Sequence, residues 1–192
     1  MIRRLIALPL VLSVGATASA QDQITPDPQA WRPVVYYDLQ FPTENAANYA
    51  SIWADKIEAN NQAYITRGET RYAVGNAPVH EAHYTVKSPS RTVVLTFLNT
   101  RTACTIKQKF PSANVNVLTC PLRVAIFEGG RKSISEASGC YLERGTTQNV
   151  SSDPTTSVSY VSYDVTKKAF RTGMIVAHKA IDGCSQEIPI YQ

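Results

Sequence analysis

Beyond its first 20 residues the sequence contains no apolar run approaching the roughly twenty residues that a membrane-spanning helix needs. It also has little excess charge, because 19 Lys and Arg residues face 15 Asp and Glu residues, for a formal net charge of +4. A charge this small provides no basic stripe of the kind that binds nucleic acid or an anionic membrane surface. We therefore expect a soluble chain that binds no nucleic acid and does not insert stably into a membrane.

Recognisable catalytic motifs are also missing. The chain has no G-x-S-x-G nucleophile elbow, no S-x-x-K pair, no C-x-x-C and no glycine-rich phosphate loop, and nothing in it implies a cofactor. A glycosidase site has no comparable sequence motif, because its two carboxylates can be distant in sequence and meet across a cleft. The sequence therefore does not exclude such a pair. Asp55 and Glu58 lie one helical turn apart beside Lys56 and are interpreted as a solvated helix face. The sequence therefore favours a non-catalytic protein but does not exclude an enzyme.

Only three histidines are available for metal binding or proton transfer. His80 and His83 do not have the zincin spacing, and at the start of a strand they would point to opposite faces. We predict that they are solvated or hydrogen-bonded, although a metal site shared with another segment stays open. His178 follows Met174 and Val176 on one expected strand face, which predicts a partly buried histidine without an identifiable catalytic partner. No metal site is predicted.

The N-terminus has the pattern of a cleavable secretory signal covering residues 1–20. Two arginines within Met1–Arg4 precede the apolar run Leu5–Val14, and Ala18-Ser19-Ala20 forms an A-x-A cleavage site. The run is too short for an anchor, and no cysteine follows it for lipid attachment. We expect cleavage after Ala20 and a periplasmic or secreted protein, whose net charge falls to +2 because two arginines are removed.

All four cysteines lie in the expected mature chain, and an even number in an exported protein predicts disulfide bonds. Four cysteines allow three pairings. A hairpin centred on Ser112 would place Cys104 opposite Cys120 on the same face of two strands. That pairing leaves Cys140 to bond Cys184 and would fasten the C-terminal segment to the middle of the chain.

One helix and many strands are predicted. The helix begins near Pro42-Thr43-Glu44, ends at Asn60-Asn61, and carries an apolar stripe with Trp53 at its centre as the anchor on a sheet. Gly129-Gly130 predicts a two-residue hairpin turn, and Pro121 predicts a bulge or an edge within the longest strand. Strands are expected at 34–41, 71–74, 82–87, 92–98, 102–107, 115–127, 132–142, 157–165 and 169–181.

This order of elements predicts an α+β fold. A helix followed by closely spaced strands indicates an antiparallel β-rich single domain, with one main N-terminal helix packed on the sheet and two disulfides. Residues 21–33, which are polar and rich in proline, are expected to form an extended arm, and residues 34–192 the domain.

Tyrosine is the most frequent aromatic residue, with 10 copies against 5 of phenylalanine and 2 of tryptophan. Tyr36, Tyr160 and Tyr163 lie in expected strands that should have one exposed face, and they are candidates for a binding face. Ordinary strand propensity and core packing account for the same residues equally simply.

These observations predict a small exported, disulfide-stabilised, non-catalytic binding or accessory protein of the bacterial cell envelope, with a protein partner there. An inhibitor or immunity protein and a subunit of a secretion or surface machine fit equally well. One alternative is a periplasmic hydrolase of cell-wall material that acts through its acids or His178. The other is a protein that binds a small ligand in a cavity between the helix and the sheet.

The disulfides should dominate the stability of the mature chain. Closing a loop of about fifteen residues between Cys104 and Cys120 contributes about 3 kcal/mol, and the longer Cys140–Cys184 loop somewhat more. Since domains are stable by about 5–15 kcal/mol, we expect a clearly lower melting temperature in reductant, measured by circular dichroism. Expression in the cytosol without residues 1–20 should likewise give poorly folded protein. Equal melting temperatures with and without reductant would contradict this expectation.

Overall fold

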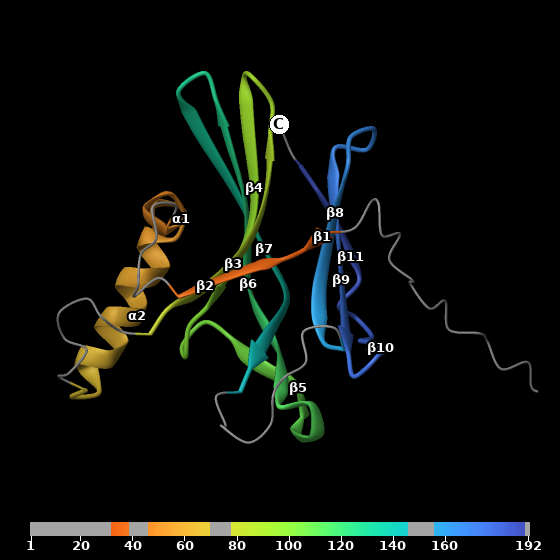
Figure 1. Ribbon diagram of the computed structural model, residues 1–192. Helices are drawn as coiled ribbons and strands as arrows, with labels where there is room; N and C mark the ends of the chain where they lie inside the picture. Colours follow the sequence, from red (N-terminus) through yellow and green to blue (C-terminus); the bar gives the residue numbers. More distant parts are fainter. Residues whose placement is uncertain (1–31, 39–45, 70–77, 146–155, 191–192) are drawn as a thin grey trace, which may run out of the picture.

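The computed structural model describes residues 32–38, 46–69, 78–145 and 156–190. Within them the chain forms three layers: two helices, a six-stranded antiparallel sheet and a five-stranded antiparallel sheet (Figure 1). The expected signal, most of the expected arm and the expected strand 71–74 fall outside the described residues.

The six-stranded sheet, here called sheet B, forms the middle layer. Its strands are β2 (Val35–Asp38), β3 (His80–Lys87), β4 (Arg91–Asn99), β5 (Thr105–Phe110), β6 (Val115–Glu128) and β7 (Arg131–Arg144). Strand β6 is central, because β7 pairs along one of its edges while β4 and β5 share the other. The glycine turn between β6 and β7 is confirmed, since Gly129 and Gly130 have φ values of 55° and 75°.

The five-stranded sheet, sheet A, covers one face of sheet B. Its strands are β1 (Arg32–Pro33), β8 (Val158–Asp164), β9 (Ala169–Val176), β10 (Lys179–Ala180) and β11 (Gln186–Pro189). The chain passes from sheet A to sheet B at Val34, which is buried and whose amide donates to the carbonyl of Ser159 at 3.0 Å. The expected strand 34–41 is confirmed in part by β2, and residues 32–33, which were expected to belong to the extended arm, instead form a strand of sheet A.

Along most of the central strands β4 and β6 both faces of sheet B are buried, which explains their apolar composition. Toward sheet A, side chains from both sheets form the main core, including Leu95, Phe97, Leu122, Val161 and Phe170. Toward the helices, alternate residues of the same strands form a second cluster, including Val94, Leu98 and Ala125. The expected packing of helical structure on one face of an antiparallel sheet is confirmed, but two helices replace the single helix expected, and a second sheet covers the other face.

The helical layer consists of α1 (Ala46–Ile52) and α2 (Ala54–Thr66), which meet at Trp53. Trp53 is 0% exposed and packs against sheet B, as its central place in the apolar stripe predicted. The predicted start of the helix, near residues 42–44, falls outside the described residues.

The predicted end of the helix at Asn60-Asn61 is wrong, since α2 continues to Thr66. Asn60, the predicted end residue, is fully buried. Its side chain accepts a hydrogen bond from the Thr102 hydroxyl at 3.2 Å and donates to the Pro78 carbonyl at 3.4 Å. These contacts with distant segments satisfy the amide within the helix, so the local preference of Asn for a helix end is overridden.

The predicted disulfide pairing is confirmed: Cys104 bonds Cys120, and Cys140 bonds Cys184. The first bond depends on an irregularity that the sequence did not reveal. The loop after β5 extends to Asn114, so the hairpin centre lies slightly beyond Ser112. A register shift between Ile106 and Gln108 corrects this offset and pairs Thr105 with Thr119. Without it, a one-residue slip would turn Cys104 away from Cys120.

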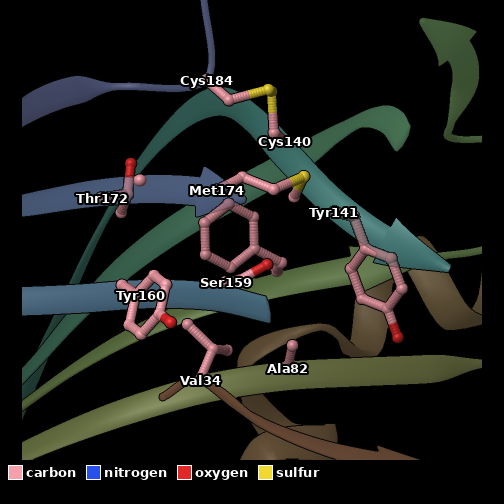
Figure 2. Close-up of a pocket in the computed structure, with 11 residues that line it drawn as sticks. Val34, Ala82, Cys140, Tyr141, Ser159, Tyr160, Thr172, Met174 and Cys184 are labelled. Atoms are coloured by element: carbon pink, nitrogen blue, oxygen red, sulfur yellow. A yellow bond between two sulfur atoms is a disulfide. The ribbon is translucent and has the colours of Figure 1, made fainter. Parts of the chain in front are cut away.

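The second disulfide links the two sheets. Cys140 lies in β7 of sheet B, and Cys184 lies between β10 and β11 of sheet A. Figure 2 shows the bond above Met174 and Tyr141, at one end of the space between the sheets. It therefore fastens the C-terminal strands across the core.

Two further expectations are corrected. The predicted strand 169–181 is interrupted, because Ala177 and His178 have positive φ values of 49° and 63° and form the turn between β9 and β10. His178 is consequently exposed rather than partly buried. Such a turn usually contains Gly or Asn, so the pair Ala-His gives no turn signal. Pro121 lies neither at a bulge nor in an edge strand, but where the neighbour of β6 changes from β4 to β5.

None of the helices among the described residues is long and apolar enough to cross a membrane.

Close packing at the inter-sheet disulfide gives a stability test. A Cβ atom added to Gly139, beside Cys140, would lie 2.6 Å from Cε1 of the buried Phe97. We expect Gly139→Ala to lower the free energy of unfolding by about 1–3 kcal/mol through overpacking, measured by urea denaturation. The neighbouring Ser138→Ala, at an exposed position, should change it by less than about 0.5 kcal/mol. Equal stabilities of the two variants would contradict this packing.

Candidate functional site

A groove lies between α1 and the face of sheet B that is turned away from sheet A. Its volume is about 290 Å³. Its lining residues come from α1, β3, β4 and β6: Tyr49, Ser51, Ile52, Thr85, Lys87, Thr92, Val94 and Phe127. We call it the α1 groove. Apolar side chains, hydroxyl groups and one ammonium group meet in it, which is the usual mixture of a small-molecule site.

The register of sheet B brings these residues together. Thr85 and Lys87 are two positions apart in β3 and so share a face, and the same holds for Thr92 and Val94 in β4. The antiparallel pairing places Lys87 beside Thr92, and Thr85 beside Val94. Four side chains from two strands thus form one continuous surface, which α1 flanks.

Tyr49 connects the α1 groove to a buried histidine. Its ring stacks on His83 with centroids 3.7 Å apart and an interplanar angle of 19°. Its hydroxyl lies 3.4 Å from Oγ1 of Thr85, within the groove lining. His83 itself is 8% exposed and does not line the groove. The ring that could transfer protons is thus packed beneath the groove rather than presented to it.

Below Tyr49 runs a chain of buried polar side chains. Nδ1 of His83 lies 2.8 Å from Oε2 of Glu81, whose other oxygen accepts a hydrogen bond from the Thr96 hydroxyl. That hydroxyl accepts in turn from Nε1 of Trp53 at 3.0 Å. Glu81 is 0% exposed, and desolvation raises the pKa of its carboxyl group despite the hydrogen bonds from His83 and Thr96. These side-chain hydrogen bonds join β3, β4 and the helical layer.

Arg123 of β6 is the second polar centre under the helices. Its guanidinium donates two hydrogen bonds of 2.6 Å to Asp55, contacts Glu136 at 2.7 and 2.8 Å, and donates to the Ile52 carbonyl at 2.7 Å. It also lies over the Trp53 ring, 4.5 Å from the centroid. Asp55 is exposed, as the sequence predicted, and is in addition an ion-pair partner of Arg123.

These ion pairs shift the pKa values of all three groups. Hydrogen bonding to Arg123 lowers the pKa of Asp55 to about 2, and the same contact raises the pKa of Arg123. Partial burial tends to raise the pKa of Glu136, but hydrogen bonds from Arg123 and Lys56 outweigh it and hold that pKa below its usual value. The cluster therefore stays ionised at neutral pH and acts as a structural tie.

The three histidines are not brought together. His80 is exposed at the start of β3, where it lines a second hollow of about 450 Å³ with Asn99, Glu143 and Arg144. Glu143 accepts hydrogen bonds from the side-chain amides of Asn99 and Asn116. His83 lies under α1, and His178 lies in the β9–β10 turn. The prediction that His80 and His83 lie on opposite faces of a strand agrees with their exposed and buried positions.

The three candidate tyrosines also occupy different surroundings. Tyr163 is half-buried and packs against Phe170 in the core, with ring centroids 5.2 Å apart. Tyr160 lines a cavity of about 10 Å³ between the sheets (Figure 2), which has room for about one water molecule. Tyr36 lies in β2 opposite Ala82, and its side chain is outside the described part.

Sequence reasoning missed Glu81, Arg123 and the groove residue Lys87. A signal existed for Arg123, since it is a single charge inside the apolar run Leu122–Phe127 of a strand expected to be buried. A charge in such a position needs a partner. Lys87 carried no comparable signal, because a lysine at the end of a strand is usually only solvated.

Within the described ranges, no group of three or more His, Cys, Asp or Glu side chains could hold a metal ion. Comparisons with protein-family models, with curated proteins and with solved structures found no match for this chain. The site therefore has to be interpreted from its own geometry.

The raised pKa of Glu81 has a measurable consequence. Because the folded protein binds this proton more tightly than the unfolded chain, protonation of Glu81 stabilises the fold. This stabilisation is fully present below the unfolded-state pKa of about 4.3 and is lost as the pH rises through the higher folded-state pKa. Glu81→Gln mimics the protonated acid, so it should be more stable than the wild type at pH 7. The difference should shrink as the pH falls toward 4. Urea denaturation across this range tests the sign, with the exposed Glu58→Gln as control; a variant that is less stable at pH 7 would contradict it.

Proposed function

We propose that this chain is an exported, disulfide-stabilised, non-catalytic binding protein of a bacterial cell envelope, and that it binds a small ligand in the α1 groove. The groove itself is the observation that carries the proposal. It combines an apolar floor with hydroxyl groups and a cation, and it is bounded by a helix whose position is fixed by buried polar contacts. Ligand sites favour such preformed concave surfaces.

The surroundings of the titratable groups support a non-catalytic role. Among the residues that the structure describes, no acid and no histidine lines the α1 groove. Glu81 and His83 are buried as a pair beneath it, and Asp55 and Glu136 are engaged by Arg123. A general acid or base needs to reach the substrate within hydrogen-bond distance, and these groups face protein partners instead.

Export is supported by the two disulfide bonds, since such bonds persist in oxidising compartments and are rare in a reducing cytosol. Each bond lies within a separate apolar cluster. Cys104–Cys120 belongs to the main core, and Cys140–Cys184 belongs to a third cluster that includes Met174.

A protein partner is the second candidate, favoured by the free edge of β7. Among the described residues β7 pairs only with β6, and most of the stretch from Arg131 to Ser138 is exposed. An exposed strand edge can accept an extended segment of another protein as an added strand. The pairs of β6 and β7 alternate from the hairpin turn, so Ile134 directs its N–H to the free edge. Ile134→Pro would remove this backbone donor, and loss of a purified complex in that variant would favour this mode.

The α1 groove can be tested by filling it. Ser51→Trp, at an exposed position of α1, should place an indole ring in the groove, whereas Ser51→Ala should leave it open. In a screen of small molecules by ¹H–¹⁵N NMR, we expect shift changes that cluster on groove residues of the wild type. They should persist in Ser51→Ala and be lost in Ser51→Trp. Melting temperatures of both variants check that they are folded.

Two outcomes would overturn the proposal. Ligand-induced shifts that are the same in Ser51→Trp as in the wild type would place binding elsewhere. Turnover of purified peptidoglycan by the wild type, abolished in His178→Ala, would establish a hydrolase instead.

A further inference from the structure

Among the described lining residues of the α1 groove, the one charged group is the ammonium group of Lys87. Within the described parts of the chain, the Lys87 side chain forms no hydrogen bond or ion pair and is exposed. Other cations near the helices are paired: Lys56 lies 3.1 Å from Glu136, and Arg123 binds Asp55. Lys87 is thus a cation at the end of a concave surface, with no counter-charge from the part of the protein that the structure describes.

Its neighbourhood is also positively charged. The tips of the β3–β4 and β6–β7 hairpins lie at the same end of sheet B (Figure 1). Residues 87–91 and 128–132, which form these tips, contain four cations and only one acid, Glu128. Lys132 also reaches α1, where it donates to the Ser51 carbonyl at 3.3 Å. This end of the groove should attract anions.

The remainder of the groove is suited to an apolar body. Ile52, Val94 and Phe127 contribute aliphatic and aromatic surface, while Thr85 and Thr92 place hydroxyl donors near Lys87. The volume of about 290 Å³ is about twice that of a ~150 Å³ cavity that holds benzene. One or two rings, or a chain of about eight carbons, would fill it. The charge lies at one end, as in an amphiphilic anion.

We propose that the ligand of the α1 groove is a small amphiphilic carboxylate, whose anionic group binds Lys87 and whose apolar body lies on Ile52, Val94 and Phe127. This inference rests on the proposed binding function and adds the chemical class of the ligand. The carboxylate replaces the missing counter-charge of Lys87, and the threonine hydroxyls donate to it. A neutral molecule would leave the ammonium unpaired, and a cation would be repelled.

The test compares three eight-carbon probes: octanoate, octanol and octylamine. Calorimetric or NMR titration of the wild-type mature protein should show octanoate binding about tenfold more tightly than octanol, and octylamine more weakly than either. Lys87→Met keeps the apolar stem but removes the charge, so octanoate affinity should fall about tenfold to that of octanol. Lys87→Arg should retain the preference, and higher salt should weaken it.

Controls separate the groove from other surfaces. Lys179→Met removes an exposed lysine from β10 of sheet A and should leave all three affinities unchanged. Ser51→Trp should abolish octanoate binding, because it occupies the same space. Octanoate binding that survives Ser51→Trp, or that is equal in Lys87→Met and the wild type, would overturn the inference.

Failure of the ligand class can be distinguished from failure of the binding function. If octanoate does not bind but other small molecules shift groove residues in a manner abolished by Ser51→Trp, the carboxylate is wrong and the groove remains a binding site. If no small molecule perturbs the groove residues, both the ligand class and the proposed function are wrong.

Discussion

The guanidinium of Arg123 is the contact on which the arrangement of the helical layer depends. A charge buried in the middle of a strand is costly unless its donors are satisfied, and here α1, α2 and β7 each provide an acceptor. The Trp53 ring covers the same group and fills the space between the helices and sheet B. Arg123 therefore holds α1 against the sheet, together with the contacts of Trp53 and Tyr49 on β4 and β3.

Burial of both faces of sheet B has a second consequence. The buried polar residues of β3 and β4 under the helices, Glu81, His83 and Thr96, are shielded from solvent, so they bond to one another and to Trp53. This removes Glu81 and His83 from contact with solvent. Lys87 and Thr85 lie farther along the same strand face, beyond this buried chain, where the surface opens into the groove. Along β3, the polar side chains at 81 and 83 are thus buried in structural contacts, whereas those at 85 and 87 are accessible to a ligand.

Several features followed from local patterns in the sequence, because a short segment determined them. Trp53 was identified as the helix anchor by its place in an apolar stripe, and the Gly129-Gly130 turn by its need for positive φ. The disulfide pairing followed from alternation along two strands of one hairpin. The end of α2 and the turn at His178 were missed, since Asn60 is satisfied by a distant segment and Ala-His is an unusual turn pair.

The sequence by itself therefore determined the antiparallel β-rich composition, the helix that covers a sheet, and the two disulfide bonds. The first two depend on side-chain periodicity within short segments. The Cys104–Cys120 bond joins residues that are close in the chain, and the Cys140–Cys184 bond follows because only these two cysteines are left. Only the tertiary structure decided that there are two sheets, that Arg123 meets Asp55, and that Lys87 borders a groove. Each of these joins segments that are far apart in sequence. Periodicity shows which face of a segment is buried, but not which other segment covers it.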